Sequence, residues 1–137
     1  MSRTTDAEAI RLFEQTLAGR ERRLGPDDPD TMRSRNDLVR AYREAGRVAD
    51  AVPLVEQTLA ARERLLGTDH PSTLASRNNL ASAYRATGRP AAAIPLFEKN
   101  LAACERLFGA DHPKTLASRR NLALACQESA QAQNEDQ

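Results

Sequence analysis

The stretch "LGTDHPSTLASRNNLASAYRATGR", residues 66–89, decides the fold because the chain contains it three times. It returns as "FGADHPKTLASRRNLALACQES" at residues 108–129, and a more divergent copy, "LGPDDPDTMRSRNDLVRAYREAGR", stands at residues 24–47. When residues 59–86 are aligned with residues 101–128, 19 of 28 positions are identical, and 17 are identical with residues 17–44, at a constant spacing of 42 residues. A fixed period of this length indicates a stacked array, in which each unit buries its apolar face against its neighbours.

Each unit contains two amphipathic helices. In the second unit, Leu74, Leu80, Ala81 and Tyr84 fall at helical spacing, and a second apolar run with the same spacing covers residues 94–108. Proline stands at the expected first position of the first helix, directly after a capping residue, and glycine ends the helices. The prolines are Pro29, Pro71 and Pro113, and the capping residues are Asp28, His70 and His112.

These signals predict an all-α fold of antiparallel helix pairs. We expect a single helical-repeat domain over residues 1–137, with a capping box of Thr5 and Glu8 at the start of the first helix and a frayed tail at residues 130–137. The expected helices cover about residues 6–24, 29–45, 48–66, 71–87, 90–108 and 113–129.

Composition excludes several classes of function. The chain has 20 basic and 19 acidic residues, so it has no long-range field that would attract nucleic acid or a membrane surface. No apolar run approaches the roughly 18 residues that span a bilayer. The polar start, "MSRTTDAEAI", has no signal-peptide core, which predicts a cytoplasmic protein. The two cysteines, Cys104 and Cys126, are then expected to be reduced and packed in the interior.

The sequence offers no catalytic or metal-binding set. His70 and His112 lie one period apart without further ligands at suitable spacing, so we interpret them as helix caps. Single glycines at helix ends do not form a phosphate-binding loop, and neither cysteine has a histidine placed to activate it. We therefore expect no enzyme activity, no cofactor and no metal.

The combined pattern resembles the tetratricopeptide repeat. The longer period and the "LGxDHPxT" linker are similar to the 42-residue variety of kinesin light chains and of bacterial repeat proteins, including sensor regions attached to NB-ARC-type ATPases. At the position of the family's usual tryptophan in the first helix, this chain has arginine in all three copies, Arg35, Arg77 and Arg119. We expect these arginines to pair with acids such as Glu56 or Glu98. The signature positions are occupied by Leu80, Ala81, Tyr84, Gly88, Ala93, Phe97 and Leu101.

The resemblance implies a right-handed α-solenoid whose first helices line a concave groove for an extended peptide. Asn79 and Asn121 match the asparagine that holds the ligand backbone in family members, and arginine in the groove favours an acidic ligand. Carried over position by position, the groove residues are Arg33, Asn36, Asp37, Arg40 and Arg43 in the first unit, Asn78, Asn79, Ser82 and Arg85 in the second, and Arg120, Asn121, Leu124 and Gln127 in the third.

The function predicted from the sequence is a non-catalytic module that binds a protein or peptide. One alternative is a structural unit that self-assembles through its open helix ends, and another is a sensor fragment of a larger regulatory ATPase. RNA binding is disfavoured, because aromatic residues that stack on bases make up only 4% of the chain.

Overall fold

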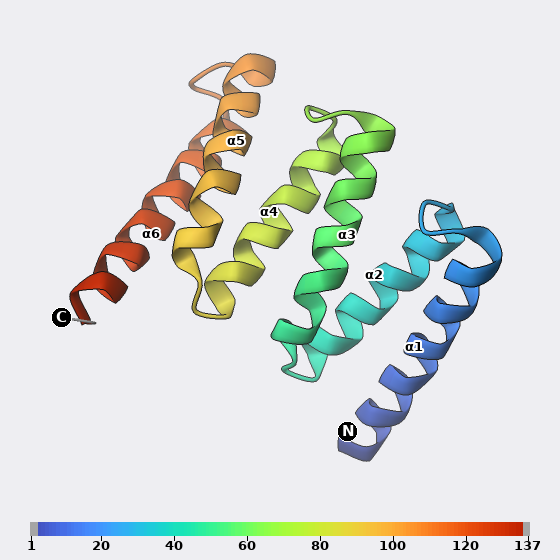
Figure 1. Ribbon diagram of the computed structural model, residues 1–137. Helices are drawn as coiled ribbons and strands as arrows, with labels where there is room; N and C mark the ends of the chain where they lie inside the picture. Colours follow the sequence, from blue (N-terminus) through green and yellow to red (C-terminus); the bar gives the residue numbers. More distant parts are fainter. Residues whose placement is uncertain (1–2, 136–137) are drawn as a thin grey trace. The chain divides into compact units, whose positions relative to one another are not determined.

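The computed structural model describes residues 3–135, and over that range its regular secondary structure is α-helix, without a β-strand (Figure 1). This confirms the predicted fold class. Each interior boundary lies within one residue of its expected position. The helices are α1 (Arg3–Leu24), α2 (Pro29–Glu44), α3 (Val48–Leu66), α4 (Pro71–Ala86), α5 (Pro90–Phe108) and α6 (Pro113–Glu135).

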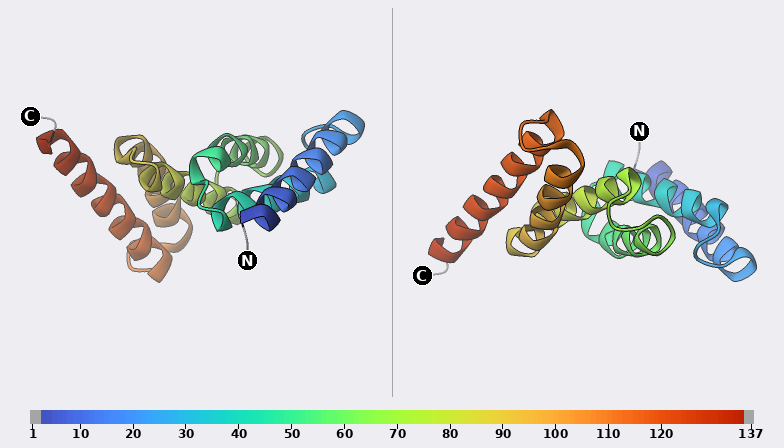
Figure 2. Two further views of the ribbon diagram at one scale, coloured as in Figure 1. Left: turned by 90° about the horizontal axis from the view of Figure 1, so that it is seen from below. Right: turned by 90° about the horizontal axis from the view of Figure 1, so that it is seen from above.

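The helices belong to two compact units, which are larger than the repeat units of the sequence and divide inside α3, between Ala61 and Arg62. From here on, the first unit is the part up to Ala61 and the second unit is the part from Arg62. In the first unit, α1 packs against α2. In the second unit, α5 packs against both α4 and α6, as the three views in Figures 1 and 2 show. The single domain expected from the repeats stays a prediction.

The core of the first unit is built from the apolar faces that the helical spacing predicts. Ile10 and Leu17 of α1 meet Leu38 and Tyr42 of α2. The Tyr42 hydroxyl donates a hydrogen bond of 2.6 Å to Oε2 of Glu14. Burial, followed by this bond to a carboxylate, raises the pKa of Tyr42 to about 12.

The core of the second unit combines one large ring with several small side chains. Phe97 of α5 is fully buried, and Ala81, Ala93 and Ala103 are buried with it. Alanine lets neighbouring helices approach closely without loss of helix propensity. The same small residues that made the repeat recognisable therefore set the distance between its helices.

The helix starts follow the predicted capping chemistry. Asp28 caps α2, where its Oδ1 accepts a hydrogen bond of 2.9 Å from the backbone N–H of Asp30. His70 does the same for α4, and Nδ1 of His112 accepts from the N–H of Lys114 at 3.1 Å before α6. Both histidines thus accept a backbone hydrogen bond through Nδ1, which confirms their interpretation as caps.

The ends of α2 and α4 share one turn, in which glycine is required. The N–H of Arg47 donates to the carbonyl of Tyr42 at 2.7 Å, and Gly46 itself donates to Arg43 at 3.0 Å. This pair of bonds needs a left-handed residue after the helix, and Gly46 has φ +75°. Gly88 repeats the geometry with φ +77°.

The C-terminal end of the described chain differs from the prediction. We expected a helix to residue 129 and a frayed tail, whereas α6 continues to Glu135. Ala130 occupies the repeat position of Gly46 and Gly88, so the left-handed turn that stops α2 and α4 is replaced by a good helix former. Helix α6 therefore continues six residues beyond its expected end, the fraying of residues 130–135 stays a prediction, and residues 136–137 lie outside the described range.

The N-terminal capping box is also wrong as a start signal. Helix α1 begins at Arg3, three residues earlier than expected, which puts the Thr5 backbone inside the first turn. An N-cap residue must lie outside the helix, so Thr5 does not fill that position. Its side chain lies outside the described residues.

Candidate functional site

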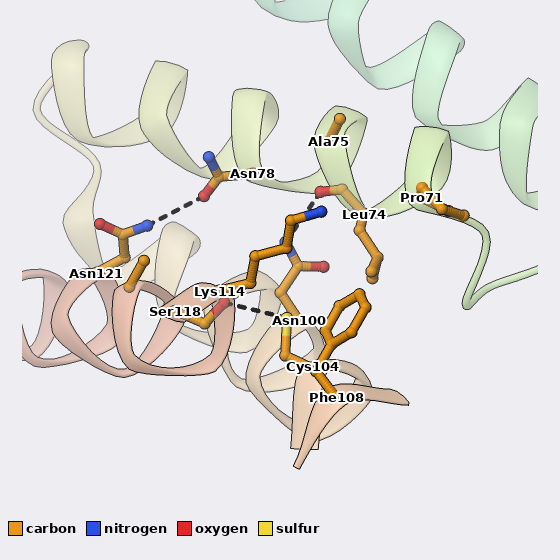
Figure 3. A pocket seen from close by; sticks show the side chains of 11 residues that line it. Pro71, Leu74, Ala75, Asn78, Asn100, Cys104, Phe108, Lys114, Ser118 and Asn121 are labelled. Carbon is orange, nitrogen blue, oxygen red and sulfur yellow. Dashed lines mark hydrogen bonds between the residues drawn. The ribbon is translucent and has the colours of Figure 1, made fainter. Parts of the chain in front are cut away.

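Helices α4, α5 and α6 of the second unit enclose a cavity of about 310 Å³ (Figure 3). The first helices of two successive repeats, α4 and α6, supply its sides, and α5 supplies its floor. The lining residues are Pro71, Leu74, Ala75 and Asn78 of α4, Asn100, Cys104 and Phe108 of α5, and Lys114, Ala117, Ser118 and Asn121 of α6.

Much of the cavity wall is apolar. Leu74 and the Phe108 ring lie on one side of it, as Figure 3 shows. Ala75 and Ala117 stand one repeat period apart on α4 and α6, and their small side chains leave space between these helices. An apolar cavity open to water gains free energy when a ligand side chain displaces that water.

Two asparagines bridge the cavity between α4 and α6. Nδ2 of Asn121 donates a hydrogen bond of 3.3 Å to Oδ1 of Asn78, and both side chains are half-buried. Their amide groups point toward each other in Figure 3. A primary amide has two N–H donors and two acceptor lone pairs, so this single bond leaves most of their capacity for a ligand.

The cavity floor comes from α5, which the sequence analysis did not include in the groove. Asn100 is buried and committed to the fold: its Oδ1 accepts from Arg77 at 2.8 Å, and its Nδ2 donates to the Leu74 carbonyl at 3.0 Å. Cys104 is one turn further along, with its Sγ 3.4 Å from Oγ of Ser118. The spacing of four residues between Asn100 and Cys104 was the signal that could have placed both on one helical face.

The positively charged side chain of Lys114 lies at the edge of the cavity. Nζ of Lys114 is 5.2 Å from the centre of the Phe108 ring, within the range of a cation–π contact. The same ring stacks on His112, with ring centres 4.7 Å apart. Sequence reasoning missed Lys114 because the other two copies have Asp30 and Ser72 at that repeat position.

Arg85 of α4, which was predicted to contact a bound peptide, already has a carboxylate partner. Its Nε lies 2.5 Å from Oε1 of Glu128 on α6. This hydrogen bond lowers the pKa of Glu128 and raises the pKa of Arg85, because it favours the charged form of each group. The pair links α4 to α6 beyond the asparagine bridge.

The other predicted groove residues of the second unit do not line the cavity. Their side chains are exposed to solvent on α4 and α6. The structure therefore brings together Asn78 and Asn121, with Arg85 nearby, and leaves five predicted residues apart from the cavity. These five residues are Asn79, Ser82, Arg120, Leu124 and Gln127.

The predicted residues of the first unit all lie on α2. Nη1 of Arg33 is 3.7 Å from the carboxylate of Asp30, and Nη2 of Arg40 is 3.2 Å from that of Asp37. Asn36 is exposed, as is Arg43. Exposed ion pairs of this kind contribute little to stability, so these side chains remain available to a partner.

Two of the three repeated arginines, Arg35 and Arg77, are buried. Arg77 is 1% exposed and donates to Asn100 and to the Thr68 carbonyl at 3.0 Å, with Glu63 as its nearest carboxylate at 3.8 Å. The expectation that these arginines pair with acids named Glu56 and Glu98 as examples, whereas the carboxylate beside Arg77 is that of Glu63. Arg35 is equally buried and donates to the Pro26 carbonyl at 3.0 Å.

Arg119 and Cys126 of α6 contradict the expectation from the repeat. Arg119 is exposed, although its counterpart Arg77 is buried by α5. Cys126 is exposed as well, whereas Cys104 is buried as predicted. Within residues 3–135, no second helix covers the side of α6 that corresponds to the α5-facing side of α4.

The described residues contain neither a metal site nor a membrane span. No group of three or more His, Cys, Asp or Glu side chains is close enough to hold a metal ion within the range that the structure covers. In the same range, no helix combines the length and the apolar character that a bilayer crossing requires.

The paired helices, repeated every 42 residues, define a helical-repeat protein. The family model for the tetratricopeptide repeat matches residues 5–64, 38–99 and 78–134. The chain therefore belongs to the tetratricopeptide repeat family, whose members are generally protein–protein interaction modules. None of the curated proteins compared with it has a significantly similar sequence.

Two solved structures show the same fold. The nearly identical TPR-like repeats of Podosopora anserina, from a protein assigned to the kinesin light chains, are 38% identical with a TM-score of 0.75. That alignment covers 94% of this chain and 61% of the other, so this chain spans less than two thirds of its relative. BtubC (BKLC) from P. vanneervenii is 16% identical with a TM-score of 0.73, covering 93% of this chain and 51% of the other, and indicates the fold alone.

Proposed function

We propose that the cavity between α4, α5 and α6 binds an extended segment of a partner protein. Asn78 and Asn121 hold the backbone of the segment, and one apolar side chain enters the cavity between Ala75 and Ala117. The observation that carries this proposal is the amide pair beside an apolar cavity. Asparagine is suited to the task because it offers a donor and an acceptor to a peptide group, whatever the side chain of that residue.

The size of the cavity favours a peptide over a small-molecule substrate. A volume of about 310 Å³ lies at the lower limit of ligand pockets and accommodates one large side chain. Burial of a leucine or phenylalanine side chain contributes about 1.5–3 kcal/mol. Further contacts along α4 and α6 must supply the rest of the affinity.

The charge near the cavity favours a carboxylate beside the anchored side chain. Lys114 lines the cavity and carries a positive charge. Arg85 adds less than the sequence suggested, because Glu128 neutralises it. We therefore assign the preference for an acidic ligand to Lys114.

The cavity chemistry supports binding rather than catalysis. Cys104 and Ser118 are potential nucleophiles in its lining, but their thiol and hydroxyl contact each other instead of a histidine or carboxylate base. Among the described residues that line the cavity there is no histidine, aspartate or glutamate that could act as the base. This agrees with the typically non-catalytic scaffold role of the family.

Peptide arrays of acidic and neutral sequences, followed by fluorescence anisotropy on the best binder, test the proposal. Asn121→Ala should weaken binding about 2- to 10-fold, the value of one net hydrogen bond. Asn79→Ala is the matched control, because Asn79 is the same residue type, is exposed and lies outside the cavity. It should change the affinity less than twofold.

The proposal fails if both variants weaken binding equally or if neither does. Thermal melts must accompany the titrations, since a lower melting temperature for Asn121→Ala would mean that the asparagine is structural. Lys114→Gln separates the charge preference from backbone recognition. It should reduce the affinity for acidic peptides and leave neutral peptides unaffected.

The position of the two cysteines offers a direct measure of occupancy. Cys104 lines the cavity, whereas Cys126 is exposed elsewhere on α6. In a Cys126→Ser background, bound peptide should slow alkylation of Cys104. The reverse variant, Cys104→Ser, reports Cys126 alone, and its alkylation rate should not respond to peptide.

A further inference from the structure

On the side of α6 that corresponds to the α5-facing side of α4, positions are exposed that are buried in α4. Ala81 of α4 is 0% exposed under α5, whereas Ala123, one period later, is exposed. Arg77 and Arg119 show the same contrast. The repeat gives α4 and α6 similar residues, so α6 carries the surface that packs against the second helix of a repeat, as α4 packs against α5. In the described chain, no such second helix covers this surface of α6.

Helix α1 shows the complementary contrast. Its sequence aligns with the second helix of a repeat, so its Leu12 and Thr16 correspond to Leu96 and Asn100 of α5. Leu96 is half-buried and Asn100 is buried against α4. Leu12, in contrast, is 62% exposed, and Thr16 is exposed beside it.

The charges at these two surfaces are also complementary. In the α4–α5 pair, Nη2 of Arg106 lies 2.9 Å from Oδ1 of Asp69. One period later the acid is Asp111, and two periods earlier the base is Arg22; both are exposed. The two halves of one ion pair therefore lie on α1 and on the linker before α6.

We propose that α1 of one copy packs against α6 of the next copy and reproduces the α4–α5 pair. Arg119 would then meet Thr16 of the next copy, as Arg77 meets Asn100. Thr16 can accept this bond, since its hydroxyl donates to the Leu12 carbonyl at 2.9 Å and keeps its lone pairs. Asp111 would pair with Arg22 of the next copy.

This contact joins two different surfaces, so it is heterologous. A heterologous contact that does not close into a ring produces an open chain of copies. Association of the 137-residue protein should therefore continue beyond a dimer as concentration rises. An isologous dimer, in contrast, would stop at twice the mass of 15.1 kDa.

Sedimentation equilibrium over a hundredfold range of concentration, with two blocking variants, tests the contact. Ala123→Arg places a large cation on the α6 surface, and Leu12→Arg does so on the α1 surface. Overpacking of this kind should weaken association at least about tenfold in each variant. Ala18→Arg is the control, because Ala18 and its counterparts Ala60 and Ala102 are all exposed.

Mixing the two blocked variants distinguishes the proposed contact from any other. Ala123→Arg keeps its α1 surface, and Leu12→Arg keeps its α6 surface, so an equimolar mixture should form a 1:1 heterodimer and stop there. Each variant alone should remain near 15.1 kDa. Circular dichroism of each variant verifies that both remain folded.

A charge exchange provides the second test. Arg22→Asp or Asp111→Arg alone should weaken association about 2- to 5-fold, in line with an exposed ion pair. The double variant restores the pair between copies and should recover the original affinity. A constant mass for the natural sequence, or association that none of these variants alters, would overturn the proposal.

Discussion

Replacement of Arg77 by methionine should destabilise the protein far more than the same change at Arg119. Arg77 is buried and satisfies two acceptors, Oδ1 of Asn100 at 2.8 Å and the Thr68 carbonyl at 3.0 Å, with Glu63 3.8 Å away. Methionine fills much of the volume but donates no hydrogen bond. The buried Oδ1 of Asn100 and the Thr68 carbonyl are then left without their donor.

The expected loss follows from these contacts. A hydrogen bond from a charged donor contributes about 1.5–3 kcal/mol, and removal of one partner from a buried charged cluster typically costs about 3–5 kcal/mol. For a domain that is stable by about 5–15 kcal/mol, this is a large fraction of the total. Arg119→Met should cost less than about 0.5 kcal/mol, because Arg119 is exposed.

Urea denaturation followed by circular dichroism at low protein concentration measures both changes. Because Arg77 and Arg119 occupy the same repeat position, the comparison isolates burial from sequence context. Equal losses in the two variants would refute the assigned environments. A second variant tests the mechanism: Arg77→Met combined with Asn100→Leu should recover part of the loss, since it removes a buried acceptor together with its donor.

Two further predictions concern the α4–α6 link and the helix ends. Glu128→Gln should lower the free energy of unfolding by up to about 1 kcal/mol at neutral pH. Because Arg85 lowers the pKa of Glu128 below 4.5, the pair stabilises above that pH, and urea titrations should show the difference vanish as pH falls through the folded-state pKa. Gly88→Ala, at φ +77°, should cost about 1–2 kcal/mol. Gly19→Ala, inside α1 with nothing within 4 Å of the added Cβ, should instead gain about 0.5–1 kcal/mol in a thermal melt.

The sequence predicted the helices well because their limits depend on local chemistry. Pro71 and His70 define the start of α4, and Gly88 requires a left-handed turn at its end. Such signals act over a few residues, so they can be recognised without tertiary structure. The end of α6 was missed although its signal was local too: Ala130 replaces glycine, and the polar composition of the tail was given more weight than that substitution.

Burial at the ends of the array could not be predicted in the same way. Arg77 and Arg119 have nearly identical neighbours in the sequence, TLASRNNLA at residues 73–81 and TLASRRNLA at residues 115–123. Whether each is buried depends on a helix that packs from elsewhere, which the local pattern does not encode. The periodic pattern thus predicts the type of surface, and the structure decides whether that surface is covered.

The candidate site was only partly predictable because facing residues are not equivalent residues. A repeat period of 42 relates Asn79 to Asn121, and the family resemblance assigned them the same role. Two side chains that meet across adjacent helices, however, must point toward each other, so they come from opposite flanks of the repeat. The bridging pairs are accordingly 43 residues apart, Asn78 with Asn121 and Arg85 with Glu128. The sequence alone thus predicted which helix faces carry the polar residues, while the packing of α5 against α4 and α6 was needed to show which of them meet at the cavity.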